Sequence, residues 1–197
     1  MQGFVFESTQ TVGQSEFAEF VAERERQGDT SHYELLNGRV VMNPPAGYPH
    51  GTIGSKLQRL LGNFVEERQL GELFDSSQGF ELPSGDTVEP DHSFVSAERW
   101  AAAPAPEEGK FLRVVPDLVV EVLSQKTASQ DRGEKKAIYA KNGVREYWLV
   151  DWRKREITIF HVDGDRYDPG TVYCNAEACE SRVLAGVDVR MSELFGG

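Results

Sequence analysis

The chain has 197 residues, of which 39% are hydrophobic and 27% are charged, a composition typical of folded globular proteins. Its length suits one domain over residues 1–197, with a core expected at about 15–195. The 21 basic and 32 acidic residues give a net charge of −11, which argues against nucleic-acid binding through a broad basic surface. A carboxylate site for divalent cations is compatible with this charge, because bound cations reverse the local sign.

The sequence also bears on where the protein acts. Residues 1–7 contain no basic segment, so we expect no secretory signal. Acids and arginines interrupt every apolar run before it could span a bilayer. Cys174 and Cys179 match neither a CxxC motif nor a disulfide framework. We therefore expect a cytoplasmic protein with two ordinary thiols and no membrane partner.

The N-terminal half predicts two helices and a hairpin. Ser15 is a plausible N-cap for a first helix, and the Asn-Gly turn at 37–38 predicts a hairpin over 33–42. An apolar stripe at helical spacing predicts a helix from about His50 to Arg68, ended by Gly71.

The remainder predicts an alternation of strands and helices. The expected strands are 71–75, 78–82, 88–95, 111–123, 146–151, 155–161 and 180–184, and the expected helices are 131–142 and 191–195. Residues 101–109 are expected to form an exposed loop. This order is typical of an α/β or α+β protein with a mixed central sheet flanked by helices, an N-terminal helix and β-hairpins.

Two acids, Asp117 and Glu121, interrupt an apolar strand, where unpaired carboxylates are costly. Strand alternation puts them on one face, but they are about 13 Å apart at about 3.3 Å per residue. That distance prevents both from binding one Mg²⁺. Asp91, at the start of the preceding strand, is the candidate partner of Glu121. Together they would bind a hard divalent cation and leave positions for water and a phosphate oxygen.

A lysine would complete such a site by stabilising the charge that develops on the phosphate. Lys135 lies in the first turn of the helix after the acidic strand, and this helix folds back over the sheet. Lys136 points about 100° away and is expected in solvent.

Three segments form a combined motif: 116–124, 131–135 with Tyr139, and 143–151. Together they resemble the Uma two family of restriction endonucleases, which has the restriction-endonuclease-like PD-(D/E)XK fold. The resemblance includes 33–38, His50 and Pro90-Asp91, and it extends from about 15 to 195.

The resemblance implies an Mg²⁺-dependent (or Mn²⁺-dependent) phosphodiesterase. Asp91 and Glu121 match the metal-binding acids, and Lys135 matches the catalytic lysine. Glu34 matches an auxiliary acid, and Asp117 is a further candidate carboxylate. The superfamily's usual lysine position, two residues after the acid of the third motif, holds Leu123 in this chain, so the lysine is expected from the following helix.

Each candidate also has a structural interpretation. Glu121 could be a buried acid paired with an arginine or with amides, and Asp91 could cap a strand. Asp117 could be a strand-entry residue, Lys135 could pair only with Asp131, and Glu34 could be exposed beside the hairpin. His50 is expected to cap or pack at its helix start, and Tyr147 and Trp148 are expected in the core.

Three functions follow from these interpretations. The first is a metal-dependent endonuclease that hydrolyses DNA phosphodiester bonds, acting as a homodimer. The second is a catalytically inactive nuclease-like fold that serves as a binding or assembly module. The third is a metal-dependent hydrolase of smaller phosphate esters.

Overall fold

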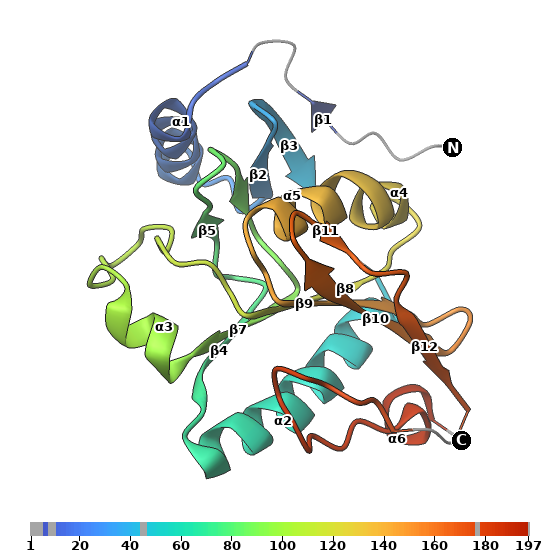
Figure 1. Cartoon of the computed structure of the whole chain (residues 1–197). Coiled ribbons are helices and arrows are strands. Elements are labelled where there is room, and N and C mark those ends of the chain that lie inside the picture. The colour runs from blue at the N-terminus through green and yellow to red at the C-terminus, as the bar shows by residue number, and fades with distance from the viewer. Residues whose placement is uncertain (1–5, 8–10, 44–46, 176–177, 197) are drawn as a thin grey trace.

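The structure is a computed structural model that describes residues 6–7, 11–43, 47–175 and 178–196. Within these residues the strands form two sheets (Figure 1). The smaller sheet has the order β1 (Phe6–Glu7), β3 (Arg39–Asn43), β2 (His32–Leu36), β6 (Thr87–Val88), β5 (Phe80–Glu81). The first five residues, which bear on the expected lack of a secretory signal, lie outside the described part.

The larger sheet is mixed. Its order is β11 (Arg166–Tyr167), β10 (Glu156–Asp163), β9 (Glu146–Asp151), β8 (Leu118–Val122), β7 (His92–Ser96), β4 (Gly71–Asp75), and β12 (Thr171–Cys174) also pairs with β10. The central strands β8 and β9 are parallel, whereas the other pairs are antiparallel. The predicted mixed α/β architecture is therefore confirmed, with the difference that the strands divide between two sheets.

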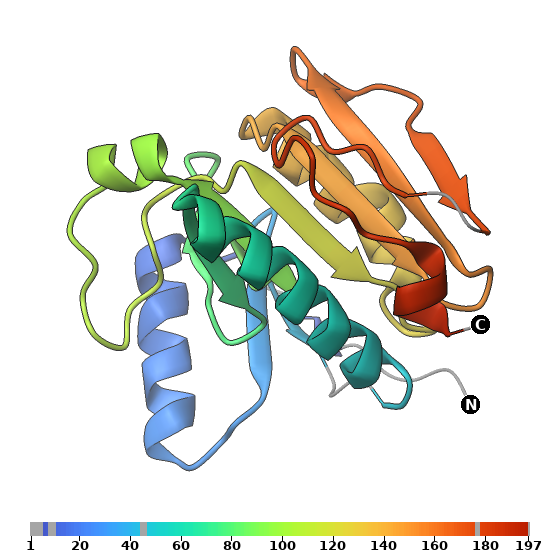
Figure 2. The ribbon, with the colours of Figure 1, turned by 90° about the horizontal axis from the view of Figure 1, so that it is seen from below.

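Helices cover both faces of the larger sheet (Figures 1 and 2). The helical elements in the described residues are α1 (Gln14–Arg26), which packs on the smaller sheet, α2 (His50–Arg68), α3 (Ala97–Ala102), α4 (Ala128–Gln130), the π-helical segment η1 (Asp131–Lys135), α5 (Lys136–Lys141) and α6 (Met191–Phe195). On one face lie α2 and α6, and on the other lie α4, η1 and α5 (Figure 1). In the described part of the chain, no helix combines the length and the apolar character needed to cross a membrane.

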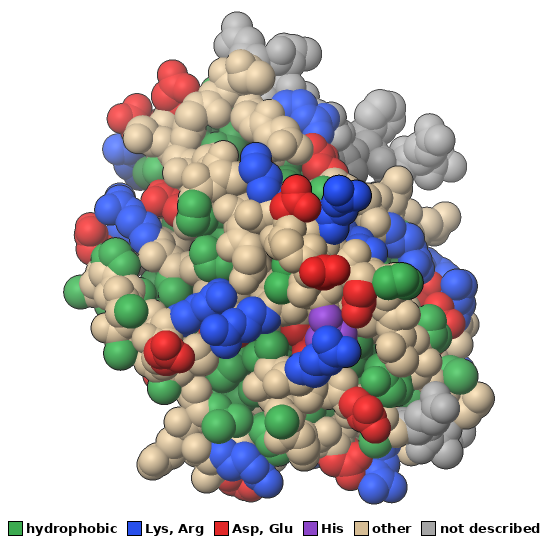
Figure 3. Space-filling view, viewed as in Figure 1, with side chains coloured by type: hydrophobic (Ala, Val, Ile, Leu, Met, Phe, Trp, Pro, Cys, Tyr) green, Lys and Arg blue, Asp and Glu red, His purple; other side chains and the backbone are tan. Residues whose placement is uncertain are grey.

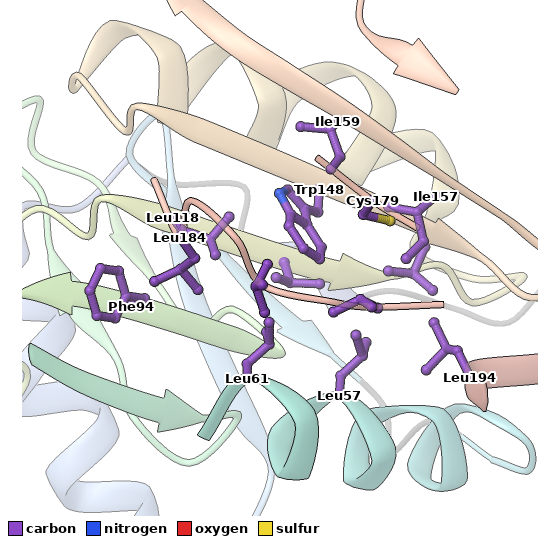
Figure 4. Packing of buried hydrophobic residues seen from close by; sticks show 14 of the residues in the cluster. Leu57, Leu61, Phe94, Leu118, Trp148, Ile157, Ile159, Cys179, Leu184 and Leu194 are labelled. Atoms are coloured by element: carbon purple, nitrogen blue, oxygen red, sulfur yellow. The ribbon is translucent and has the colours of Figure 1, made fainter. Parts of the chain in front are cut away.

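Two hydrophobic clusters follow from the periodicity of the sequence. The apolar stripe of α2 packs against one face of β8, where Leu118 and Val120 point (Figure 4). The alternate residues Val119 and Leu123 point to the opposite face, into a cluster that also contains residues of the smaller sheet. Tyr147 and Trp148 are both fully buried, as predicted. Glu121 therefore lies on the face that the two sheets share.

Prolines divide two of the predicted strands. The strand expected over 88–95 is interrupted at Pro90, where the chain passes from β6 in the smaller sheet to β7 in the larger one. The strand expected over 111–123 is regular only over Leu118–Val122, after Pro116, and Leu112 instead bridges to Phe80. Proline has no N–H to donate to a ladder, so each proline lies in a segment where the chain passes from the smaller sheet to the larger one.

Other predicted boundaries were wrong. The N-cap of α1 is Gly13, whose N–H donates to the Glu16 carboxylate, and Ser15 lies inside the helix. Gln69, with φ of 52°, ends α2, whereas Gly71 is the first residue of β4. The strand expected at 78–82 contains only the two residues of β5.

The C-terminal prediction also needs correction, because residues 180–184 do not form a strand. The backbone N–H groups of Arg182 and Val183 instead donate to the buried carboxylate of Glu146. The helix α3 and the strand β12 were not predicted, and α3 occupies the start of the expected 101–109 loop.

Candidate active site

Asp91 directly precedes β7, and Glu121 lies in the adjacent antiparallel strand β8. His92 pairs with Val120 in the register of β7 and β8, so continuing the register by one residue places Asp91 opposite Glu121. Directly opposed residues in an antiparallel pair have Cβ atoms about 4.5–5.5 Å apart on one face. The backbone N–H of Val122 also donates to Asp91 Oδ2 over 2.7 Å, which fixes this carboxylate against β8.

Lys135 contacts two buried carboxylates, those of Glu121 and Glu34. Its Nζ lies 2.6 Å from Glu121 Oε1 and 2.9 Å from Glu34 Oε1, and all three side chains are almost completely buried. Glu34 belongs to β2 of the smaller sheet, whereas Glu121 belongs to β8 of the larger one. The lysine therefore joins the two sheets through charged contacts.

Neutral donors complete these contacts. Tyr139 Oη donates to Glu121 Oε1 over 2.8 Å, Asn43 Nδ2 donates to Glu34 Oε2 over 2.6 Å, and the Glu89 N–H donates to Glu34 Oε1. Buried carboxylates need such partners to offset the loss of hydration. The contacts hold both acids in defined positions.

The π-helical segment η1 places two ionisable groups in this cluster. Asp131 and Lys135 are both buried on it, with Asp131 Oδ1 4.0 Å from Lys135 Nζ. π-helical turns occur frequently at functional sites. The expected pairing of Lys135 with Asp131 is therefore present, but it is the longest of the three carboxylate contacts of the lysine.

The cluster has more buried acids than buried cations. Burial raises the pKa of Glu121 well above its ordinary value, and burial likewise raises the pKa of Asp131 to about 6. Burial alone would lower the pKa of Lys135, but the nearby Glu121, Glu34 and Asp131 carboxylates raise it well above its ordinary value. Lys135 therefore stays charged, and the surplus negative charge favours a bound cation.

His50, the first residue of α2, orients Asp91. Its Nε2 lies 3.0 Å from Asp91 Oδ2, and both side chains are partly exposed. Burial alone would lower the pKa of His50 and raise the pKa of Asp91. The hydrogen bond and the charge attraction between the two groups outweigh burial, so the pKa of His50 is raised and the pKa of Asp91 is lowered. Asp91 is therefore ionised, as a metal ligand must be.

The donor set fits a hard divalent cation. Within the described residues, no three His, Cys, Asp or Glu side chains form a ready-made metal site. Mg²⁺ commonly uses only one or two carboxylates and completes its shell with water and substrate phosphate. The hydrogen bonds of Asp91 use Oδ2 and the contacts of Glu121 use Oε1, so one oxygen of each can serve as a ligand.

Comparison with known proteins agrees with this geometry. Residues 17–192 match the family model described as "Uma2: Putative restriction endonuclease". The chain belongs to the Uma2 family. Its fold is similar to that of a solved structure from Anabaena variabilis ATCC 29413, titled "a putative nuclease belonging to DUF820". The two share 17% sequence identity with a TM-score of 0.70, over 83% of this chain and 89% of that chain. No curated protein matches.

Asp117 lies elsewhere in this Uma2 chain. It directly precedes β8, at the end of the strand opposite to Glu121. Its Oδ1 lies 3.1 Å from Arg99 Nε and 3.2 Å from Arg145 Nη1, and its Oδ2 accepts from the Ser96 N–H. In the view of Figure 3, Lys and Arg side chains are interspersed with Asp and Glu side chains over the surface. The structure thus brings Glu34, Asp91, Glu121 and Lys135 together and leaves Asp117 outside.

Three neighbours of the cluster were not among the candidate site residues. Asp131 was considered only as an ion-pair partner of Lys135, although its i, i+4 spacing already indicated a shared helix face. The only signal for His50 was its position at a helix start. Tyr139 was part of the family motif, one turn after Lys135, and its hydroxyl contacts Glu121.

Proposed function

We propose that this Uma2 protein is a metal-dependent endonuclease that hydrolyses DNA phosphodiester bonds. The observation that supports the proposal is the proximity of Asp91, just before β7, and Lys135, in η1, to the β8 strand that carries Glu121. These residues match the two acids and the lysine of the restriction-endonuclease motif. Mg²⁺ or Mn²⁺ would be held by Asp91 and Glu121, with Glu34 as the auxiliary acid.

Each residue of the candidate site would have its own role in hydrolysis. A bound divalent cation supplies Lewis acidity toward a phosphoryl oxygen and lowers the pKa of its water. Asp91 is held ionised by His50, and Glu121 is oriented by Tyr139 and Lys135. The positive charge of Lys135 offsets part of the negative charge that builds up on the phosphate.

The proposal is tested by incubating the purified protein with plasmid and single-stranded DNA, with Mg²⁺ or Mn²⁺ and then with EDTA. We expect metal-dependent cleavage that Glu121→Gln abolishes. A matched control is Glu134→Gln, because Glu134 lies beside Lys135 in sequence but pairs with Arg39, away from Glu121. Absence of metal-dependent cleavage, or cleavage that Glu121→Gln leaves intact, contradicts the proposal.

A second candidate is an inactive fold that serves as a binding module, favoured by the absence of a ready-made metal site in the described residues and by the missing lysine at position 123. Titration calorimetry with Mg²⁺ and Mn²⁺ separates the two, because a dead site shows no affinity that depends on Asp91 and Glu121. A bis-phosphodiester substrate screen detects the third option, a smaller phosphate ester. Light scattering at micromolar concentration tests the predicted homodimer.

A further inference from the structure

Three consecutive basic residues, Arg153, Lys154 and Arg155, form the turn between β9 and β10. No other three basic residues are consecutive in the sequence, and all three are exposed. We call them the basic turn. The chain as a whole has a net charge of −11, so this local concentration of positive charge runs against the rest of the molecule. A local patch of one sign attracts a partner of the opposite sign.

The turn does not depend on these basic side chains for its shape. Asp151 Oδ1 accepts from the N–H groups of Arg153 and Lys154, over 3.1 Å and 3.3 Å, and aspartate closes turns in this way. Arg155 has a φ of 59°, a conformation that glycine or asparagine adopts at lower cost. The backbone therefore gives no reason for arginine at position 155 or for a basic residue at position 153.

The two arginines have contacts that orient them but do not neutralise them. The Arg153 guanidinium lies over the Trp152 ring, with Cζ 4.4 Å from the ring centre. Arg155 donates to the Gly196 carbonyl. Among the described residues, neither arginine forms an ion pair with an acid. A guanidinium group has five N–H donors, so both side chains keep donors for an anion such as a phosphate.

The basic turn lies at the same edge of the larger sheet as the candidate active site. The strands β8 and β9 are parallel, so their C-terminal ends meet at one edge, and Glu121 pairs with Leu149 in their register. Asp151 is two residues further along β9, about 8 Å from Glu121 at about 3.3 Å per residue and about 4.8 Å between strands. The segment η1 spans this distance, because Lys135 contacts Glu121 and Arg132 pairs with Asp151 over 2.7 Å.

This separation matches the spacing of phosphates in DNA. Arg153 follows Asp151 by two residues, so it lies at most about 7 Å further along the chain. The basic turn is therefore about 8–15 Å from Glu121. One strand of DNA has a phosphate about every 3.4 Å along the helix axis, so the distance corresponds to about two to four nucleotides.

We propose that the basic turn binds the DNA backbone about two to four nucleotides from the scissile phosphate. Arg153 and Arg155 pair with phosphate oxygens, whereas Lys154, whose Nζ lies 3.2 Å from Glu156 Oε1, contributes less. Such contacts position the strand without reading its sequence. The inference rests on the proposed nuclease function, because that function places the scissile phosphate beside Glu121.

The test is a fluorescence-anisotropy titration of a labelled duplex oligonucleotide at several salt concentrations, in EDTA so that no cleavage occurs. We expect the double variant Arg153→Gln with Arg155→Gln to bind about tenfold more weakly than the wild type at low salt. The slope of the logarithm of the association constant against the logarithm of the salt concentration should become shallower by about two, because two phosphate contacts are lost. Arg153→Lys with Arg155→Lys keeps both charges and should keep the wild-type slope.

The matched control is Arg26→Gln with Arg166→Gln. It removes the same charge from side chains that are 71% and 87% exposed, and these lie in α1 and in β11, away from the basic turn. This variant should bind with the wild-type slope. The melting temperature of each variant shows that it is folded.

The outcomes separate this inference from the nuclease proposal. A wild type that does not bind the duplex overturns the inference, as does a double glutamine variant of the basic turn that binds like the wild type, even if the wild type cleaves DNA. A control variant that loses as much affinity and slope also overturns it, because the effect would then be one of overall charge. A loss confined to the basic turn supports the inference, even if no cleavage is ever detected.

Discussion

The Nζ atom of Lys135 lies 2.6 Å from Oε1 of Glu121, at the centre of the contact between the two sheets. Glu34 meets the same ammonium group from the smaller sheet. One cation thus serves two buried acids, so its removal leaves both without their main charge partner. The energetic consequence is larger than for a surface ion pair.

We expect Lys135→Met to lower the free energy of unfolding by about 3–5 kcal/mol, because it leaves buried carboxylates uncompensated. Urea denaturation in EDTA measures the change. Lys136→Met is the control, since Lys136 is half-buried against the Phe160 ring and its loss should cost about 1 kcal/mol or less. Equal effects of the two substitutions would contradict the central role of Lys135.

The sequence predicts most accurately those helices and strands whose apolar residues follow one regular spacing from end to end. The bounds of α2, β4, β9 and α6 were all predicted correctly, because each has an uninterrupted apolar pattern. Strand spacing also predicted that Asp117 and Glu121 lie too far apart to share a cation, and the two residues lie toward opposite ends of β8.

Contacts between the sheets could not be predicted in this way. Glu34 meets Lys135 only because β2 belongs to a second sheet packed against the first, and no local pattern reports that packing. The same holds for His50, whose partner Asp91 lies 41 positions later in the chain. The ends of β8 and β7 were misjudged because prolines move the chain between sheets.

Gly71 does not end a helix, as its position had suggested, but begins β4 at a point where the backbone of β7 passes very close. Its φ is +147°, and a Cβ there would lie 2.1 Å from the Val95 carbonyl oxygen and 2.7 Å from the Ala97 nitrogen. Backbone atoms cannot move aside, so we expect Gly71→Ala to destabilise the fold by about 3 kcal/mol or more. Thermal unfolding measures this. Gly62→Ala is the control, because a Cβ at Gly62 would lie at an ordinary 3.8 Å from Leu73 Cδ2 and little loss is expected; an equally small loss for Gly71→Ala would contradict the prediction.

Asp117 offers a test of which acids form the site. It is fully buried and contacts Arg99 and Arg145, so Asp117→Asn should lower stability by about 3 kcal/mol. Its distance from Glu121 predicts that Mn²⁺ affinity, measured by calorimetry on the folded variant, stays at the wild-type value. A metal affinity reduced as much as in Asp91→Asn would place Asp117 in the site after all.

Asp131 predicts a specific pH dependence of stability. Burial raises its pKa from 3.8 to about 6 in the folded chain. Between these values the folded state holds a proton that the unfolded state has released, so this group's contribution to stability falls as pH rises. Asp131→Asn has no such proton. Relative to wild type, the variant should gain on the order of 2 kcal/mol between pH 4 and pH 7.

The measurement is urea unfolding of both proteins across this pH range in EDTA, since a bound cation would mask the effect. Groups outside the cluster contribute to both proteins and cancel in the difference, whereas the pKa of Glu121, which the Asp131 charge raises, falls in the variant and changes the difference in the same direction. Asp165→Asn, at a side chain that is 80% exposed, provides the surface baseline and should give a difference that is independent of pH. A flat or opposite trend for Asp131→Asn would mean that this carboxylate is not stabilised in its protonated form, and that the cluster carries less surplus negative charge than its burial implies.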